Sequence, residues 1–182
     1  MLKFLKYIGQ LILSPGNGWE DVSHAGYDPK SLASIGLYPL IGLASMTTFL
    51  GLLFDQESIV VTLLQQAIIV FVALFVTYFI AIAILGVLLQ FLTEGEPNEK
   101  KYTTVITYSV ALMAIAKLLE NCIPINLPLL YFLYIYIALI IWKSVRYLAI
   151  KEKRVPYFVL MAIFSIIILP FIIEWVLSLI IL

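Results

Sequence analysis

Three ionisable residues of this sequence, Lys117, Glu120 and Glu174, lie within long apolar stretches and are the side chains most able to do chemistry there. Lys117 and Glu120 are three residues apart, so a helix places them on one face. Glu174 follows Pro170 in the last apolar stretch. A charge at membrane depth is costly and marks a functional site by default. We treat the three residues as a candidate intramembrane polar cluster.

Three interpretations of this cluster follow from the sequence. In the first, Lys117 extends to the aqueous layer and both glutamates lie among lipid headgroups. In the second, Lys117 pairs with Glu174 between two helices and Glu120 is its local partner. In the third, the cluster relays protons or ions.

A second group of charged residues lies outside the apolar stretches and is basic. A cluster of this kind next to a membrane segment fixes its orientation and faces anionic lipid or an acidic partner. We predict such a lipid- or partner-facing loop from Lys143, Arg146, Lys151, Lys153 and Arg154.

Cofactor and catalytic chemistry have little support in this sequence. It has a single cysteine, Cys122, and a single histidine, His24, which we expect on opposite sides of the membrane, so they cannot share a zinc site. No phosphate-binding glycine loop, nucleophile elbow or pair of catalytic carboxylates is present. We predict no catalytic residue, no metal site and no cofactor, and therefore not an enzyme.

The composition indicates which elements hold these residues. The chain has 182 residues, 63% of them hydrophobic and 12% charged, with a net charge of zero. Soluble domains are about 45–50% apolar and about 25% charged. This composition excludes a basic nucleic-acid binder, a disordered tail and a disulfide-stapled secreted domain. We predict an all-α, polytopic membrane helix bundle.

The uncharged runs predict five transmembrane helices within residues 31–182. A span needs about 20 apolar residues. The longest run, 58–93, is interpreted as one helix because a second crossing there would move the later basic residues to the wrong side. The predicted spans are about 31–54, 59–92, 102–122, 126–148 and 155–181.

This arrangement places every basic residue except Lys117 on the cytoplasmic side. The N-terminus is then cytoplasmic and the C-terminus lies on the opposite side. Residues 1–30 form a cytoplasmic or interfacial segment that begins with an amphipathic helix. Its expected interfacial anchors are Lys3, Lys6 and Trp19. A signal peptide is the alternative, but no small-residue cleavage site follows.

Several features together give the chain a resemblance to a known family. They are the Pro15 to Trp19 segment (Ser-Pro-Gly-Asn-Gly-Trp-Glu), the five spans with a cytoplasmic N-terminus, and the Tyr108-Ser109 pair in span three. The chain resembles the Yip1 family in its short bacterial form. The proline that follows this pair in many members is absent here, and so is the Asp-Leu-Tyr-Gly-Pro-type segment of eukaryotic members. The small-GTPase partners of those members are therefore not carried over.

The resemblance implies a non-enzymatic protein of a bacterial inner (plasma) membrane, with a scaffold, adaptor or membrane-organising role. Membrane lipids are the expected partners, together with partner proteins or a homo-oligomer, and no nucleic acid is expected. The alternative is a small solute or ion transporter or channel, as a homo-oligomer. Against it, an odd number of spans does not divide into the paired halves of many transporters.

Overall fold

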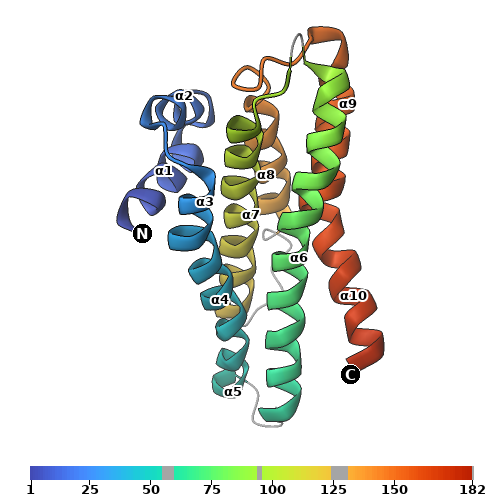
Figure 1. The fold of residues 1–182 in the computed structure, drawn as a ribbon. Coiled ribbons are helices and arrows are strands. Elements are labelled where there is room, and N and C mark those ends of the chain that lie inside the picture. Colours follow the sequence, from blue (N-terminus) through green and yellow to red (C-terminus); the bar gives the residue numbers. More distant parts are fainter. Residues whose placement is uncertain (55–59, 94–95, 124–130, 182) are drawn as a thin grey trace.

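The computed structural model describes residues 1–54, 60–93, 96–123 and 131–181. Within these ranges the chain is helical apart from short turns, and it contains no strand. The helices pack side by side as an elongated bundle, with two short helices at the N-terminus set against one end (Figure 1). The all-α prediction is confirmed for this part of the chain.

The first two helices, α1 (Leu2–Leu13) and α2 (Pro15–Ala25), form a hairpin. A Cβ on Gly18 would lie 3.0 Å from the backbone of Leu11, so glycine is what lets the two helices approach this closely. The hairpin ends at Gly26, whose positive φ of 60° suits a residue without a side chain. We call this unit the N-terminal hairpin.

The apolar side of α1 is divided between the protein and its surroundings. Phe4, Ile8 and Leu11 are buried. A Cβ on Gly36 would lie 2.5 Å from the ring of Phe4, so the absence of a side chain at Gly36 makes room for this ring. The predicted amphipathic helix therefore packs these three apolar residues against the protein and not against the membrane. The side that stays exposed carries Leu2, Leu5, Ile12 and Leu13.

The next part of the chain, from Pro29 to Leu53, is long and apolar enough to cross a membrane. Asp28 caps its start by accepting a hydrogen bond from the backbone N–H of Ser31 at 3.3 Å. It consists of α3 (Pro29–Leu32), the π-helical η1 (Ala33–Leu37), α4 (Tyr38–Met46), the 3₁₀ segment η2 (Thr47–Leu50) and α5 (Gly51–Phe54).

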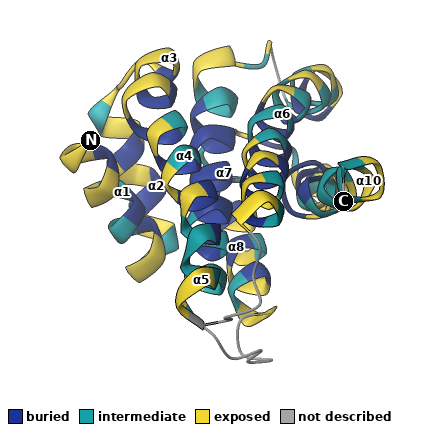
Figure 2. Ribbon diagram, turned by 90° about the horizontal axis from the view of Figure 1, so that it is seen from below, coloured by how far each residue is buried: buried dark blue, intermediate teal, exposed yellow. Residues whose placement is uncertain are grey.

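Two longer helices form the middle of the bundle. Helix α6 (Val60–Leu92) contains 33 residues, and the predicted first residue of this span, 59, lies outside the described residues. Helix α7 (Glu99–Cys122) begins after Asn98, whose side chain accepts a hydrogen bond from the N–H of Lys101 at 3.2 Å. Helix α7 lies at the centre, surrounded by other helices, and is largely buried (Figure 2).

The fourth predicted span is only partly described. Helix α8 (Tyr131–Lys143) has 13 residues, or about 20 Å at 1.5 Å per residue, against a hydrocarbon layer of about 30 Å. The predicted end at residue 148 is wrong, because the chain leaves the helix after Lys143 and turns from Ser144 to Ala149. Ala149 has a φ of 53°, which a right-handed helix does not accommodate. The predicted start, 126–130, lies outside the described residues.

The chain then returns along the bundle to its C-terminal end. The N–H of Lys151 donates to the carbonyl of Leu92 at 3.2 Å, which joins this turn to the end of α6. The last stretch, Glu152–Ile181, again has the length and hydropathy of a span. Near its end Gln65 Nε2 donates to the carbonyl of Ile181 at 2.9 Å, so it finishes beside the start of α6. Its elements are η4 (Glu152–Arg154), α9 (Val155–Ala162), the π-helical η5 (Ile163–Ile168) and α10 (Leu169–Ile181).

Each of the two π-helical segments precedes a proline in the second position of the next helix, Pro39 in α4 and Pro170 in α10. Proline has no N–H and its ring clashes with the carbonyl four residues earlier. A wider turn before the proline relieves this clash within a membrane helix. The chain thus keeps two prolines in its spans without breaking them.

Four helical stretches of the described chain are therefore long and apolar enough to cross a membrane, and α8 is a fifth, shorter apolar helix. This defines a helical bundle of the integral membrane class.

Candidate functional site

The three ionisable residues of the predicted polar cluster lie together in the structure. Lys117 Nζ is 2.9 Å from Glu174 Oε2 and 3.5 Å from Glu120 Oε2. The side chains are 14%, 17% and 24% exposed, respectively, so the pairs are mostly shielded from the surroundings. This geometry corresponds to the second of the three interpretations, in which Lys117 pairs with Glu174 between two helices and Glu120 is the local partner.

Two aromatic residues complete this cluster. The Tyr134 hydroxyl on α8 donates to Glu120 Oε1 at 2.6 Å. Its ring lies edge-on to Phe171 of α10, with centroids 5.0 Å apart, and Lys117 Nζ lies 5.1 Å from the centroid of Phe171. The cluster thus connects α7, α8 and α10 by an ion pair, a hydrogen bond and a cation–π contact.

The polar cluster predicted from the sequence includes neither Tyr134 nor Phe171. The signal that could have found Tyr134 is its place in the aromatic run Tyr131–Tyr136, since a tyrosine that packs inside a bundle needs a partner for its hydroxyl. For Phe171 the only signal is its spacing of three residues from Glu174, which places both on one helix face.

The charges of the cluster do not cancel. One lysine faces two carboxylates, and Glu174 Oε1 is buried with no hydrogen-bond partner in the described part of the chain. An unpaired carboxylate oxygen at this depth is costly. Chemically, the cluster can hold helices together, and the free oxygen can accept a hydrogen bond from one further donor.

Trp19 is not the interfacial anchor that we predicted. It is only 2% exposed, and its Nε1 donates to the carbonyl of Ile140 on α8 at 2.9 Å. Its ring stacks on Tyr147 with centroids 6.0 Å apart and meets Tyr108 edge-on at 6.4 Å. Trp19 is therefore the core residue that fixes α2 to the bundle.

The aromatic core around Trp19 reaches both helices of the N-terminal hairpin. Phe4 of α1 stacks on Tyr108 of α7 with centroids 5.0 Å apart and an angle of 17° between the rings. Tyr108 and its neighbour Ser109 are fully buried, and neither hydroxyl has a partner among the described residues. Four rings from four parts of the chain, Phe4, Trp19, Tyr108 and Tyr147, thus form one cluster.

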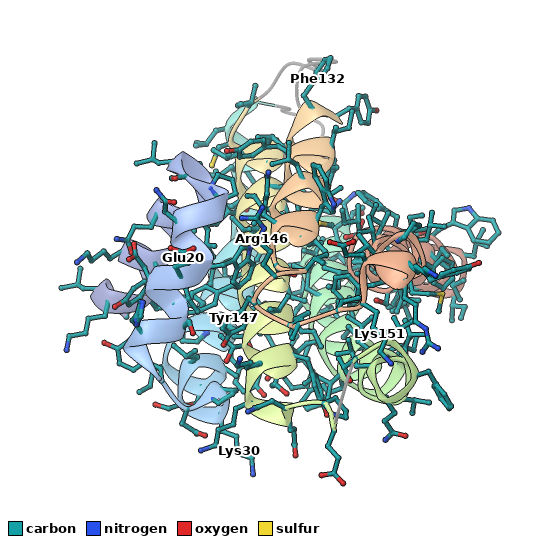
Figure 3. The ribbon with its side chains drawn as sticks, turned by 90° about the horizontal axis from the view of Figure 1, so that it is seen from above. Glu20, Lys30, Phe132, Arg146, Tyr147 and Lys151 are labelled. Carbon is teal, nitrogen blue, oxygen red and sulfur yellow. The ribbon has the colours of Figure 1, made fainter. Side chains whose placement is uncertain are left out.

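The predicted basic loop divides into two parts. Lys143 and Arg146 line a cavity beside α2, on the same side as Glu20 and Tyr147 (Figure 3). Lys151, Lys153 and Arg154 do not line this cavity and lie closer to α9. Lys3 and Lys6 are exposed on α1, as expected of residues that face headgroups.

One further cation belongs with this cavity. Lys101, near the start of α7, lines it and lies 5.4 Å from the centroid of the Tyr147 ring. Burial raises the pKa of the Tyr147 hydroxyl, so the phenol stays neutral and does not neutralise this lysine. The described residues contain no group of three histidine, cysteine or acidic side chains able to hold a metal ion.

The fold and the two charged regions thus define an integral membrane helical bundle with an internal ion pair and a basic end. No family model, no curated protein and no solved structure matches this chain.

Proposed function

We propose that the chain is a non-enzymatic integral membrane protein of the Yip1 type, which acts as a scaffold or adaptor or organises the membrane around it. It crosses a bacterial inner membrane five times, with its N-terminus in the cytoplasm and its C-terminus on the opposite side. Its partners are lipids and other proteins, including further copies of itself.

One observation carries this proposal. The residues on which the family resemblance rests, Trp19 of the N-terminal segment and Tyr108 of α7, pack directly against each other, with ring centroids 6.4 Å apart. A fixed N-terminal hairpin on a basic end is what an adaptor needs, because a rigid surface loses less entropy when a partner binds. The Lys117 cluster supports a structural role, since it joins three helices.

The course of the chain supports five passes rather than four. Trp19 contacts Ile140 near the end of α8, and Lys151 contacts Leu92 at the end of α6, so these residues share one end of the bundle. Helix α7 starts at that end and α8 finishes there (Figure 1), which is the arrangement that two passes between these points would give and which favours an odd number of passes.

Cysteine labelling with a membrane-impermeant maleimide tests this topology. Cys122 is exposed and the chain has no other cysteine. We expect labelling from outside intact cells or spheroplasts. In a Cys122→Ser background, a cysteine appended after Leu182 is also labelled from outside, whereas Ser23→Cys is labelled only after the membrane is opened. A four-pass protein instead places the appended cysteine and Ser23→Cys on the same side.

Reconstitution in liposomes separates an adaptor from the transporter alternative. We expect no flux of protons, monovalent cations or small anions above that of protein-free liposomes. Site-specific crosslinking in cells from a photoreactive residue at the exposed position of Glu152 should give one discrete adduct, and Lys151→Glu/Lys153→Glu should reduce its yield. Flux that disappears in Glu174→Gln would overturn the adaptor proposal and identify the Lys117 cluster as a conduction site.

A further inference from the structure

A cavity of about 530 Å³ opens at the basic end of the bundle, between the N-terminal hairpin and the turns that follow α8. Its cationic side chains come from separate parts of the chain: Lys101 from the first turns of α7, Lys143 from the end of α8 and Arg146 from the turn after it. The facing wall is α2, which contributes the cavity's acidic residue, Glu20. Figure 3, which views this end from above, shows Glu20 on the N-terminal hairpin with Arg146 and Tyr147 beside it.

These three cations have no carboxylate partner among the described residues. Every ion pair within 4.0 Å in the described part of the chain involves Lys117. Lys101 and Lys143 instead contact aromatic faces, with Nζ 5.4 Å from the Tyr147 centroid and 4.9 Å from the Trp142 centroid. Aromatic contacts leave the ammonium N–H groups free to donate. The cavity therefore has an excess of positive charge and unused donors.

A smaller cavity of about 160 Å³ adjoins the first and shares Ser23, Lys101 and Tyr147 with it. Tyr108 lines its inner side and is fully buried, and its hydroxyl has no hydrogen-bond partner among the described residues. Buried hydroxyls without a partner are rare and need an explanation. A ligand that enters between α2 and α7 would supply the missing acceptor.

The walls of the cavity are fixed before any ligand binds. The Trp19 ring, which lies under the cavity, is fixed by its hydrogen bond to Ile140 and by its stacking on Tyr147. The turn that holds Arg146 is joined to α6 through the backbone bond from Lys151 to Leu92. Fixed cations lose little conformational freedom on binding, which favours affinity.

We propose that this cavity binds a phosphate group, carried either by an anionic lipid headgroup or by a small soluble phosphate compound. One guanidinium and two ammonium groups are the donors that proteins use for phosphate. The volume is within the usual range of about 300–1,000 Å³ for small-molecule sites. Trp142, half exposed at the cavity, is a residue typical of the headgroup layer, which is where a lipid phosphate lies. The proposal goes beyond the adaptor function and does not require it.

The test measures binding by the full-length protein in neutral detergent, followed by tryptophan fluorescence. Trp19 and Trp142 line the cavity, and Trp175→Phe removes the signal of the remaining tryptophan on α10. The probes are dioctanoyl phosphatidylglycerol, dioctanoyl phosphatidylcholine, glycerol 3-phosphate and inorganic phosphate. We expect saturable binding of phosphatidylglycerol, of the soluble phosphates, or of both.

A matched pair of variants distinguishes the cavity from general charge. Lys143→Gln/Arg146→Gln removes two cations that line it, and Lys151→Gln/Lys153→Gln removes two cations from the same loop that do not. The first pair should weaken binding about 10- to 30-fold and the second less than about threefold. These lysines and Arg146 lie at the surface or are half-buried, and circular dichroism checks that both variants stay folded.

The pattern of binding identifies the source of the phosphate. Saturation by phosphatidylglycerol without competition by soluble phosphate indicates a lipid headgroup, whereas competition at similar affinity indicates a soluble ligand. No saturable binding of any probe, or equal weakening in both variants, overturns the proposal. Because binding is measured in detergent, a failure to bind phosphate does not change the conclusions from cysteine labelling or from flux in liposomes. Equally, a flux measured in liposomes does not decide whether the cavity binds phosphate.

Discussion

Replacing Lys117 by glutamate is expected to lower the free energy of unfolding of the purified protein by about 3–5 kcal/mol. In the unaltered protein Lys117 Nζ lies 2.9 Å from Glu174 Oε2. The variant replaces this attraction by three carboxylates placed together. These side chains are less than a quarter exposed, so solvent screens their repulsion only weakly. Titration of the protein in dodecyl maltoside with sodium dodecyl sulfate, followed by circular dichroism, measures the loss.

Two further variants separate a specific pair from general sensitivity to charge. Lys117→Glu/Glu174→Lys restores an opposite-charge pair between α7 and α10 and should recover at least half of the lost stability. Recovery is incomplete because Glu120 then faces a glutamate three residues away. Lys143→Glu, at an exposed position, should change stability by less than about 1 kcal/mol. Absence of any recovery in the double variant contradicts the ion pair.

Replacing Trp19 by alanine is expected to release the N-terminal hairpin while the rest of the bundle stays folded. The change removes the largest buried side chain and leaves the Ile140 carbonyl without its donor. Loss of a buried large aromatic residue costs about 3–5 kcal/mol, and an unsatisfied buried group adds about 1–3 kcal/mol. Hydrogen exchange measured by mass spectrometry should then rise in residues 2–25 and remain slow in α6 and α7.

The controls for this result are two substitutions of tryptophan. Trp19→Phe keeps most of the ring but lacks the N–H donor, so exchange in the hairpin should be intermediate. Trp175→Ala removes a ring that is 64% exposed and should leave the hairpin protected. Equal exchange in Trp19→Ala and the unaltered protein would mean that the hairpin is held without this residue.

Charge and hydropathy in the sequence predict the main helices, because both properties are local. Bounded uncharged runs led to α6 and to the stretches Pro29–Leu53 and Glu152–Ile181 within a few residues. The same reasoning found Lys117, Glu120 and Glu174, since a charge within an apolar run is visible without any structure. Their pairing was one of three open interpretations, because the distance between α7 and α10 depends on how helices pack.

Contacts between distant parts of the chain were beyond sequence reasoning. The sequence around Trp19 is typical of a headgroup anchor. Its role in the core is visible only from its hydrogen bond to Ile140, 121 residues away. The end of α8 was missed for a related reason. Val145 and Leu148 continue the apolar pattern, but Leu148 is buried at the turn and not in a helix. Hydropathy alone cannot distinguish these two settings.

The π-helical segment before Pro170 also determines the direction, around the helix axis, in which the side chains of α10 point. Each residue inserted into an α-helix rotates the later side chains by about 100° around the axis. The extra residue within Ile163–Ile168 therefore sets the direction in which Phe171 and Glu174 point. Without it, both side chains turn by more than a quarter of a revolution, away from Lys117. The π-helical segment Ile163–Ile168 thus sets the rotation of the last helix about its axis, and the ion pair depends on that rotation.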